Sequence, residues 1–247
     1  MLVIGRNPVF ETLKNSPESI NKIVFLNGLT DNKITELERT AKLKNITVEK
    51  LSKEQFEVLF DKKDKSEGIS QGVFAEVKDF EYSKTTEILK FAENNDTVTL
   101  VILDEVQDPH NFGAIIRTAA AAGALGIIIS DKNSVKVNHT VIKTSSGATN
   151  HIKISKEPNI YKTIAVLKES GYKIIGTMLK NSDDIYNYRF PEKCAVVFGG
   201  EGSGLRKNII NLCDAVVKIP MSGKIESLNV SVSAGVVLFE ILRQRNL

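Results

Sequence analysis

The sequence predicts a two-domain α/β protein, with a small α/β/α domain followed by a larger domain built on a parallel sheet. In residues 97–247, short runs rich in valine and isoleucine alternate with helical stretches, as is typical of strands covered on both faces. Residues 1–77 alternate strand-like and helical segments more compactly. A length of 247 residues suits one large domain or two modest ones. The polar stretch 78–96 shows no strand pattern, so we expect a linker that holds at most one short helix.

The composition is that of an ordinary soluble globular protein. Hydrophobic residues make up 42% of the chain and charged residues 26%, which excludes wholesale disorder. The net charge of +3 argues against a purely electrostatic RNA clamp. This charge is unevenly placed, because residues 1–80 are neutral and residues 97–247 carry +5. The basic excess therefore lies wholly in the second predicted domain.

The cysteines and the apolar runs exclude several other classes of protein. Cys194 and Cys213 lie in apolar stretches without C-x-x-C spacing, so we expect buried thiols rather than a disulfide framework or a zinc site. The longest apolar run, residues 119–129, is shorter than the roughly 18 residues that a membrane span needs. The N-terminal stretch has no apolar core of secretory length. The sequence therefore predicts a cytoplasmic protein with no membrane segment and no metal.

Local patterns predict each element of the first domain. Asn7 and Pro8 suit the N-cap and the first position of a helix over 7–14. Ser52 and Gln55 have the spacing of a capping box, which predicts a helix that begins at Ser52. A further helix is predicted by apolar residues at helical spacing, namely Ile34, Leu37, Ala41 and Leu43. Strands are predicted at 22–26, 46–51 and 72–77.

The second domain shows a more regular alternation. Its apolar runs predict six strands, at 98–103, 126–130, 151–154, 173–177, 194–198 and 215–219. Helices are predicted at 112–122, 159–169 and 229–245. Ligands of open parallel sheets bind outside the carboxyl ends of the strands, so the segments that follow the strands are the candidates for a site. Polar residues and glycines gather after the strands that begin at 98, 194 and 215.

The segment after the strand at 194–198 contains four glycines in six residues. Gly199, Gly200, Gly202 and Gly204 allow a positive φ and a close approach of backbone amides to a ligand. The spacing is neither a dinucleotide fingerprint nor a phosphate-binding P-loop. A tight turn is the alternative interpretation, although a turn has no need of the carboxylate of Glu201.

Asn111 and Arg117 are the candidates after the first strand of the second domain. Arg117 is the only charged residue between Asp108 and Asp131, on a helix otherwise rich in small residues. Its structural alternative is a salt bridge, for example with Glu201. For Asn111 the alternative is an N-cap, because it lies near the start of the helix.

The third candidate group follows the strand at 215–219. It comprises Ile219, Pro220 and Met221, and then small polar residues around Ser227, Leu228 and Asn229. Side-chain oxygens and free N–H groups at a helix start can hold a polar ligand. A capped helix that ends on Arg243 and Arg245 is the alternative, and it leaves the crowding of hydroxyl and amide groups in one turn unexplained.

Taken together, these segments resemble the SpoU/TrmH family of RNA 2′-O-ribose methyltransferases. The patterns N-F-G-A-x-x-R-T-A, V-x-G-x-E-G-x-G-L and I-P-M-x-G-x-x-x-S-L-N-V-S-V occur in order within residues 103–240. Ser233 departs from the family pattern, which often has alanine there. I-G-R-N-P-V-F-E-T-L near the start and G-I-S-Q-G-V near residue 70 are similar to the L30e-like substrate-binding domain of the subgroup that modifies guanosine in 23S ribosomal RNA.

The resemblance implies a fold, a reaction and a cofactor. The fold is a SPOUT-type parallel sheet with a trefoil knot, in a homodimer, preceded by an L30e-like domain over 1–77 and a linker over 78–96. The reaction is transfer of a methyl group from S-adenosylmethionine to a ribose 2′-hydroxyl of RNA, with large-subunit ribosomal RNA as the expected target. The alternatives are a transfer RNA target, ribosomal RNA methylation that confers antibiotic resistance, and a catalytically silent RNA-binding homologue.

The resemblance also assigns residues to roles. Arg117 holds the position proposed to activate the hydroxyl, and because a guanidinium scarcely deprotonates we expect it to bind the RNA phosphate beside the target ribose. The residues expected to orient the reacting groups are Asn111, Glu201, Ser227 and Asn229. The cofactor is expected at Thr177, Met178, Leu179, Gly199, Gly200, Glu201, Gly202, Ile219, Met221, Ser227, Leu228 and Asn229. RNA contacts are expected at Arg6, Asn7, Gln71 and Arg117.

Overall fold

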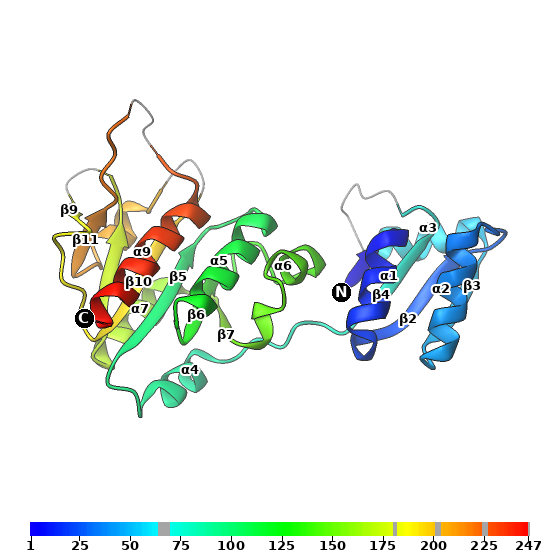
Figure 1. Cartoon of the computed structure of the whole chain (residues 1–247), viewed down its shortest axis with the longest axis horizontal. Coiled ribbons are helices and arrows are strands. Elements are labelled where there is room, and N and C mark those ends of the chain that lie inside the picture. The colour runs from blue at the N-terminus through cyan, green and yellow to red at the C-terminus, as the bar shows by residue number, and fades with distance from the viewer. Residues whose placement is uncertain (64–69, 180–181, 201–203, 224–226, 247) are drawn as a thin grey trace. The chain divides into compact units, whose positions relative to one another are not determined.

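The computed structural model describes residues 1–63, 70–179, 182–200, 204–223 and 227–246 (Figure 1). It contains two compact units, Met1–Phe80 and Glu81–Leu247. Each unit has its own sheet and its own buried core. The two units are described separately below.

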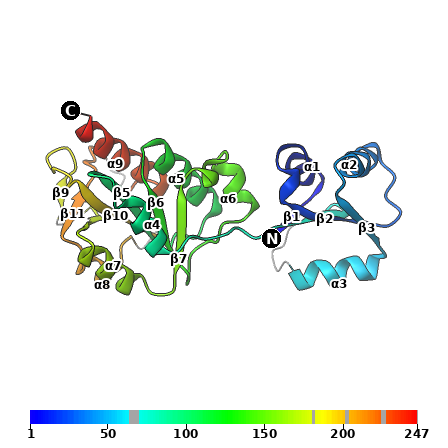
Figure 2. The ribbon, with the colours of Figure 1, turned by 90° about the horizontal axis from the view of Figure 1, so that it is seen from below.

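The first unit is a three-layer α/β/α sandwich. Its four-stranded sheet has the order β1-β4-β2-β3, in which β2 and β3 are parallel and the other pairs are antiparallel. Helices α1 and α2 cover one face and α3 covers the other, where Phe56 packs against Phe74 with ring centroids 5.1 Å apart (Figure 2). The elements are β1 (Leu2–Ile4), α1 (Arg6–Asn15), β2 (Ile20–Leu26), α2 (Asn32–Leu43), β3 (Thr47–Leu51), α3 (Lys53–Lys63) and β4 (Val73–Val77).

The predicted elements of the first unit are present, with three differences. Helix α1 begins at Arg6 with Gly5 as its N-cap, so Asn7 lies inside the helix and does not cap it. Leu43, the last residue of α2, is 74% exposed, whereas Ile34, Leu37 and Ala41 are buried as predicted. Strand β1 escaped prediction, since three residues are too few to show a periodic pattern. The capping box is confirmed, because Ser52 and Gln55 each bond the backbone N–H of the other at 3.3 Å.

The second unit contains a seven-stranded sheet that is parallel throughout. Its strand order is β7-β6-β5-β10-β8-β11-β9, so β10 lies between β5 and β8. The strands are β5 (Val98–Asp104), β6 (Gly126–Ser130), β7 (Lys153–Glu157), β8 (Lys173–Thr177), β9 (Asp183–Asp184), β10 (Lys193–Gly199) and β11 (Ala215–Lys218). The helices are α4 (Thr85–Ala92), α5 (Pro109–Ala121), α6 (His139–Thr144), α7 (Ile160–Glu169), α8 (Lys207–Ile210) and α9 (Val230–Arg245).

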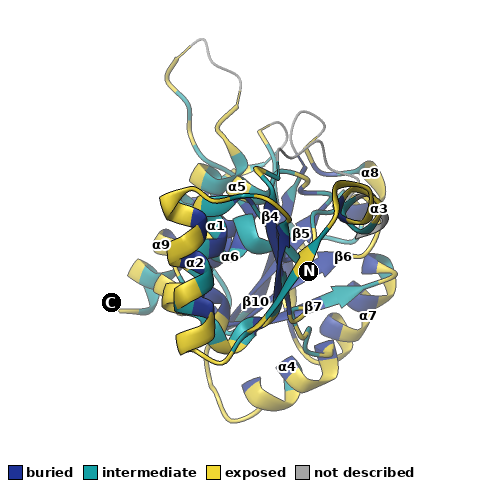
Figure 3. Ribbon diagram, turned by 90° about the vertical axis from the view of Figure 1, so that its right-hand side faces the viewer, coloured by how far each residue is buried: buried dark blue, intermediate teal, exposed yellow. Residues whose placement is uncertain are grey.

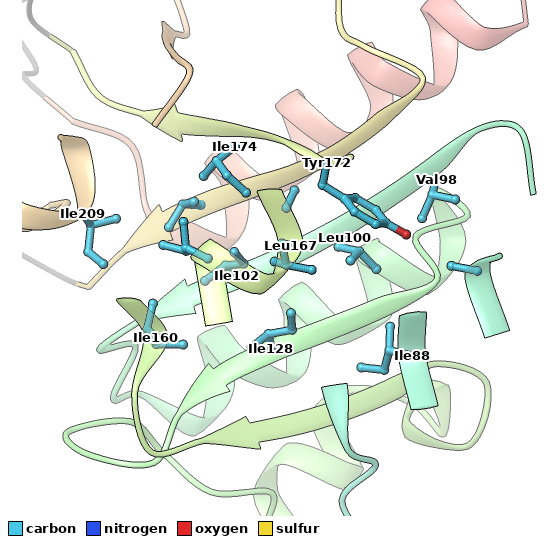
Figure 4. Close-up of a cluster of buried hydrophobic side chains, with 14 of the residues drawn as sticks. Ile88, Val98, Leu100, Ile102, Ile128, Ile160, Leu167, Tyr172, Ile174 and Ile209 are labelled. Carbon is cyan, nitrogen blue, oxygen red and sulfur yellow. The ribbon is translucent and has the colours of Figure 1, made fainter. Parts of the chain in front are cut away.

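Helices cover both faces of this sheet, as the continuous apolar strands require. On one face α4, α7 and α8 enclose a cluster of buried side chains that includes Ile102, Ile128 and Ile164 (Figure 4). On the other face α5 packs against α9 and α6 (Figure 2). Each of the longer helices is buried on one side and exposed on the other (Figure 3). The predicted mixed α/β fold with a parallel sheet is confirmed, and the trefoil knot stays a prediction.

The stretch 81–96, expected as part of a linker, belongs to the second unit. Helix α4 buries Ile88 and Ala92 in the core of this unit, at 0% and 1% exposure. A Cβ on Gly126 would lie 2.7 Å from Cγ2 of Ile88, so the helix and strand β6 are in close contact. The buried residues of α4 are Thr85, Ile88 and Ala92, which lie on one face of this eight-residue helix, and the helix docks through them.

The sequence predicts no disulfide, no membrane segment and no metal site, and the described residues can be compared with each of these expectations. Cys194 is buried and Cys213 is half-buried, and neither forms a disulfide. Burial raises the pKa of both thiols above its ordinary value, to about 11 for Cys213. Within the described residues, no helix is long and apolar enough to cross a membrane. The same residues contain no group of three or more metal-ligating side chains.

Candidate functional site

Four strand ends meet at one edge of the large sheet. Strands β5, β10, β8 and β11 are neighbours in that order, and Gly199 at the end of β10 is in register with Asp104 at the end of β5. The segments that follow them contain the glycine run and the polar groups that the sequence singles out. Parallel strands necessarily bring these segments to the same edge, where ligands of such sheets bind.

Helix α5 starts at this edge with a cap that the sequence analysis assigned differently. Asp108 is the N-cap, and its carboxylate accepts hydrogen bonds from the N–H groups of His110 at 3.1 Å and Asn111 at 3.2 Å. Pro109 takes the first helical position, where no N–H is needed. The interpretation of Asn111 as an N-cap is therefore wrong, because the helix begins three residues earlier than predicted. Its side chain is available for another contact.

That contact is with Asn229, 118 residues further along the chain. The Asn229 amide nitrogen donates to Oδ1 of Asn111 at 2.9 Å. The Asn229 amide oxygen caps helix α9 and accepts from the backbone N–H of Ser231 at 2.8 Å. One side chain thus caps a helix with its acceptor and joins the first and third candidate segments with its donor. The structure brings these two predicted residues together.

Arg117 lies exposed on α5, two turns beyond Asn111. Its Nη1 donates to Oγ of Ser146 at 3.1 Å, in the turn after α6. This turn lies close because α6 packs tightly on α5 at Gly113, where a Cβ would be 2.6 Å from Cβ of Thr144. The proposed partner Glu201 lies outside the described residues. The guanidinium is therefore held at one edge and open to solvent elsewhere.

Two residues of the glycine segment, Gly199 and Gly200, are packed too closely for side chains. A Cβ on Gly199 would collide with the carbonyl of Gly204 and the nitrogen of Leu205, and a Cβ on Gly200 would collide with the carbonyl oxygen of Glu105. The N–H of Gly204 donates to the carbonyl of Gly200 at 3.2 Å, so these two described residues lie side by side. Glu201 and Gly202 lie outside the described residues. At Gly199 and Gly200, glycine is required by the protein's own backbone.

The remaining predicted cofactor residues lie at the end of β8 and in the segment that follows β11. Oγ1 of Thr177 donates to the carbonyl of Val197 at 2.9 Å, and the N–H of Met178 donates to the carbonyl of Val217 at 2.9 Å. These bonds fix the end of β8 between β10 and β11. Leu179 is 41% exposed, Ile219 and Met221 are half-buried, and Ser227 and Leu228 are exposed. The group combines backbone polar atoms, small polar side chains and apolar surface.

The sequence analysis missed an ionic cluster beside the glycine segment. Arg206, two residues after Gly204, forms ion pairs with Asp104 and Glu105 at the end of β5. Asp104 is 1% exposed, which is rare for a carboxylate. An aspartate that ends an otherwise apolar strand was the signal that could have pointed to it. The arginine partner, about a hundred residues away, carries no such local signal.

In the first unit, the three predicted RNA-binding residues lie together. The backbone N–H of Arg6 donates to Oε1 of Gln71 at 3.2 Å, and Nε of Arg6 donates to the Gln71 carbonyl at 3.1 Å. Nη1 of Arg6 also pairs with Asp31 at 2.8 Å, and Lys33 donates to Asn7. They border a hollow of about 600 Å³ whose apolar wall contains Leu26 and Leu29.

Comparison with known sequences identifies the family. The sequence model described as the SpoU rRNA Methylase family matches residues 98–239, which include all the candidate groups at the sheet edge. A second model, described as RNA 2′-O ribose methyltransferase substrate binding, matches residues 2–83. The chain belongs to the SpoU family. It is an RNA methyltransferase with an N-terminal substrate-binding domain, and the resemblance found in the sequence is confirmed.

Individual relatives of this SpoU chain agree with the assignment. A Bacillus subtilis protein, YacO, whose name places it in the TrmH family of tRNA/rRNA methyltransferases, is 36% identical over 99% of this chain and 96% of its own length. A Staphylococcus aureus protein with the same family name is 35% identical over the same shares. A solved Aquifex aeolicus TrmH/SpoU tRNA modifying enzyme is 30% identical, with a TM-score of 0.57 over 65% of this chain and 82% of its own.

The SpoU methyltransferase AviRb from Streptomyces viridochromogenes shares the fold over the full length. Its TM-score is 0.67, with 23% identity, and the match covers 100% of this chain and 90% of AviRb. AviRb has also been solved in complex with the cofactor AdoMet. At 23% identity, this similarity is evidence for a shared fold only.

The double role of Asn229 can be separated by two substitutions. Asn229→Ala removes the cap of α9 and should lower the free energy of unfolding by about 1 kcal/mol. Asn229→Asp keeps the capping oxygen but loses the donor to Asn111, so the stability should stay within about 0.5 kcal/mol of wild type. We expect both variants to lose methyl-transfer activity, as measured by label incorporation into RNA.

Asn159 supplies a matched control for that pair, because it caps α7 with its oxygen 3.1 Å from the N–H of Lys162. Asn159→Ala should lose comparable stability in urea unfolding and keep its activity. Full activity in Asn229→Asp would show that the bond to Asn111 has no part in the reaction.

Proposed function

We propose that this SpoU enzyme transfers the methyl group of S-adenosylmethionine to a ribose 2′-hydroxyl, that of a guanosine in large-subunit ribosomal RNA, in the cytoplasm. The observation that carries the proposal is the bond between Asn111 and Asn229, which joins two family motifs at the edge where the glycine segment also lies. A protein that merely bound RNA would have no need of this arrangement.

The residues at the sheet edge fit the proposed cofactor. Backbone groups at the ends of β8 and β10 can hydrogen-bond an adenine base, and Ile219 and Met221 offer apolar surface on which the base can pack. Ser227 and Asn229 add small polar groups at the start of α9. When bound, S-adenosylmethionine supplies an activated methyl group on a sulfonium, which is a good leaving group.

The chain's own contribution is to position the RNA. Arg117 is exposed and can offer a pair of N–H donors to the phosphate beside the target ribose, which aligns the 2′-hydroxyl. A guanidinium stays protonated and is a poor base, so its role is binding and orientation. The hydrogen bond between Asn111 and Asn229 joins their two segments and holds the surrounding backbone in place. We propose Glu201 and Ser227 as further orienting groups.

The first unit supports an RNA substrate larger than a single nucleotide. Its match to the substrate-binding family and the grouping of Arg6, Asn7 and Gln71 favour contact with an exposed RNA loop. Ribosomal RNA is favoured over transfer RNA because the matched catalytic family is described by rRNA. The names of some relatives include tRNA, so the test must also be able to detect transfer RNA as the target.

The test maps 2′-O-methylation in ribosomal RNA from the parent strain, from a deletion strain and from the complemented deletion strain. One guanosine in large-subunit RNA should lose its methyl group in the deletion strain and regain it on complementation. Purified enzyme with labelled S-adenosylmethionine should modify the same site on unmodified transcripts. Loss of a transfer RNA methyl group with intact ribosomal RNA would overturn the proposed target but not the chemistry.

We also propose that the enzyme acts as a homodimer, with α9 in the interface. Val232 and Phe239, which lie two turns apart on this helix, are 50% and 48% exposed, and Leu228 just before the helix is 37% exposed. Such a stripe of apolar side chains is typical of a helix that packs against a partner.

Phe239→Glu should therefore convert the protein to a monomer, because it places a charge in an apolar interface. Light scattering after gel filtration should give twice the mass of one chain for wild type and the single mass for the variant. Val166→Glu changes a 41% exposed residue on α7 and serves as the control, with no change of mass expected. A monomeric wild type would contradict the proposal.

A further inference from the structure

An ionic cluster of Asp104, Glu105 and Arg206 lies directly beside the glycine segment and is not explained by the proposed reaction so far. Nε of Arg206 donates to Oδ2 of Asp104 at 3.0 Å, and Nη2 donates to Oδ1 of the same carboxylate. The third nitrogen, Nη1, pairs with Oε1 of Glu105 at 3.0 Å. The guanidinium also lies 5.5 Å from the ring centre of Tyr161. All three nitrogens of the arginine are therefore engaged.

Stability alone does not account for this ionic cluster. Asp104 is 1% exposed and the Arg206 side chain 35%, and an ion pair with a buried carboxylate usually yields little net stabilisation, because the carboxylate loses its hydration. The planar fork of arginine fixes the direction as well as the distance of its partner. Such a pair is suited to set geometry.

The geometry that it sets is that of the glycine segment. Asp104 is in register with Gly199, where the chain enters the segment, and Arg206 lies two residues after Gly204, where the chain leaves it. The carbonyl of Glu105 packs against Gly200 too closely for any side chain. The strand ladder with β5 holds the segment at Gly199, and Arg206 holds it at Gly204.

We propose that Arg206 is a positioning residue for the cofactor: bound to Asp104 and Glu105, it holds Gly204 and Leu205 against Gly199, so that the backbone of these described residues can bind S-adenosylmethionine. This inference depends on the proposed use of that cofactor. Loss of Arg206 would release Gly204 and Leu205 from this position, while Gly199 would stay in its ladder with β5. The affinity for the cofactor should fall, while the binding of RNA should not change.

Arg206→Gln tests this directly, with Arg243→Gln as a matched control. Arg243 forms the same two-bond pair with a buried carboxylate, at 2.8 Å on each bond to Glu240, away from the glycine segment. Calorimetric titration of the full-length protein with S-adenosylmethionine should show a Kd raised at least about tenfold for Arg206→Gln and unchanged for Arg243→Gln. KM for the cofactor should rise in parallel, while KM for RNA and kcat at saturating cofactor stay within about threefold.

Two milder variants keep the test decisive if Arg206→Gln fails to fold. Arg206→Lys retains a charge beside Asp104 but lacks the fork, and Glu105→Gln removes only the outer ion pair. Both should melt near the wild-type temperature and show an intermediate loss of cofactor affinity. Wild-type affinity in the folded variants would overturn the role of Arg206. Failure of the wild-type protein to bind S-adenosylmethionine would instead overturn the proposed cofactor.

Discussion

Arg117→Ala is expected to abolish methyl transfer, with kcat lowered at least about a hundredfold, while the affinity for S-adenosylmethionine stays largely intact. The side chain is exposed and, within the described residues, donates a hydrogen bond to Ser146, so its removal should cost the fold little. Its loss removes the donor pair that would align the RNA phosphate and the ribose hydroxyl. Label transfer from S-adenosylmethionine to RNA gives the rate, and calorimetry gives the cofactor affinity.

Two further variants sharpen this result. Arg189→Ala removes another exposed arginine of the same unit and should keep full activity. Arg117→Lys keeps the charge but cannot form two parallel bonds, so it should recover only part of the rate. Retained methylation by Arg117→Ala would remove this residue from the mechanism. Loss of cofactor binding together with activity would indicate that the substitution had disturbed the sheet edge instead.

Gly199→Ala is the second substitution with a large expected effect. The added methyl group would collide with the backbone of Gly204 and Leu205, which cannot move aside as a flexible side chain could. We expect a loss of about 1–3 kcal/mol in the free energy of unfolding, as overpacked sites show, and the loss of measurable cofactor binding. Urea unfolding and calorimetry measure the two effects separately.

Gly235→Ala is the control for that substitution. Gly235 lies in the interior of α9, and a Cβ there would make an ordinary contact of 3.7 Å with Cγ2 of Thr118. Alanine is favoured over glycine inside a helix by up to about 1 kcal/mol, so stability should be kept or raised. An undisturbed Gly199→Ala variant would show that the glycine segment can open to accept a side chain.

The strands and most helices were predictable because each depends on a local pattern. The apolar run at 126–130 predicts β6 at its observed bounds, and Ser52 with Gln55 marks the start of α3. The errors were local as well. The pattern at Asn111 suits a helix cap, but Asp108 and Pro109 mark the start of α5 three residues earlier than predicted. The predicted position of β7 was two residues early, as is common at the ends of elements.

Helix α4 shows where a local pattern was insufficient. Its stretch is polar in composition, and its buried residues, such as Ile88 and Ala92, are too few to distinguish a docked helix from a linker. Contact with Gly126 decides the matter, because the missing side chain on β6 leaves room for Ile88. A space on another element cannot be read from the helix itself.

The sequence by itself determined the two α/β domains, the family and the segments of the candidate site. Each of these features depends on a hydrophobic period or a motif that lies within one short stretch of the chain. Only the tertiary structure decided which side chains meet, as with Asn111 and Asn229 or Asp104 and Arg206. The reason is the strand order, which places β10 between β5 and β8 and so brings residues about a hundred positions apart to one edge. Strand order follows from the packing of the whole domain, and no local pattern encodes it.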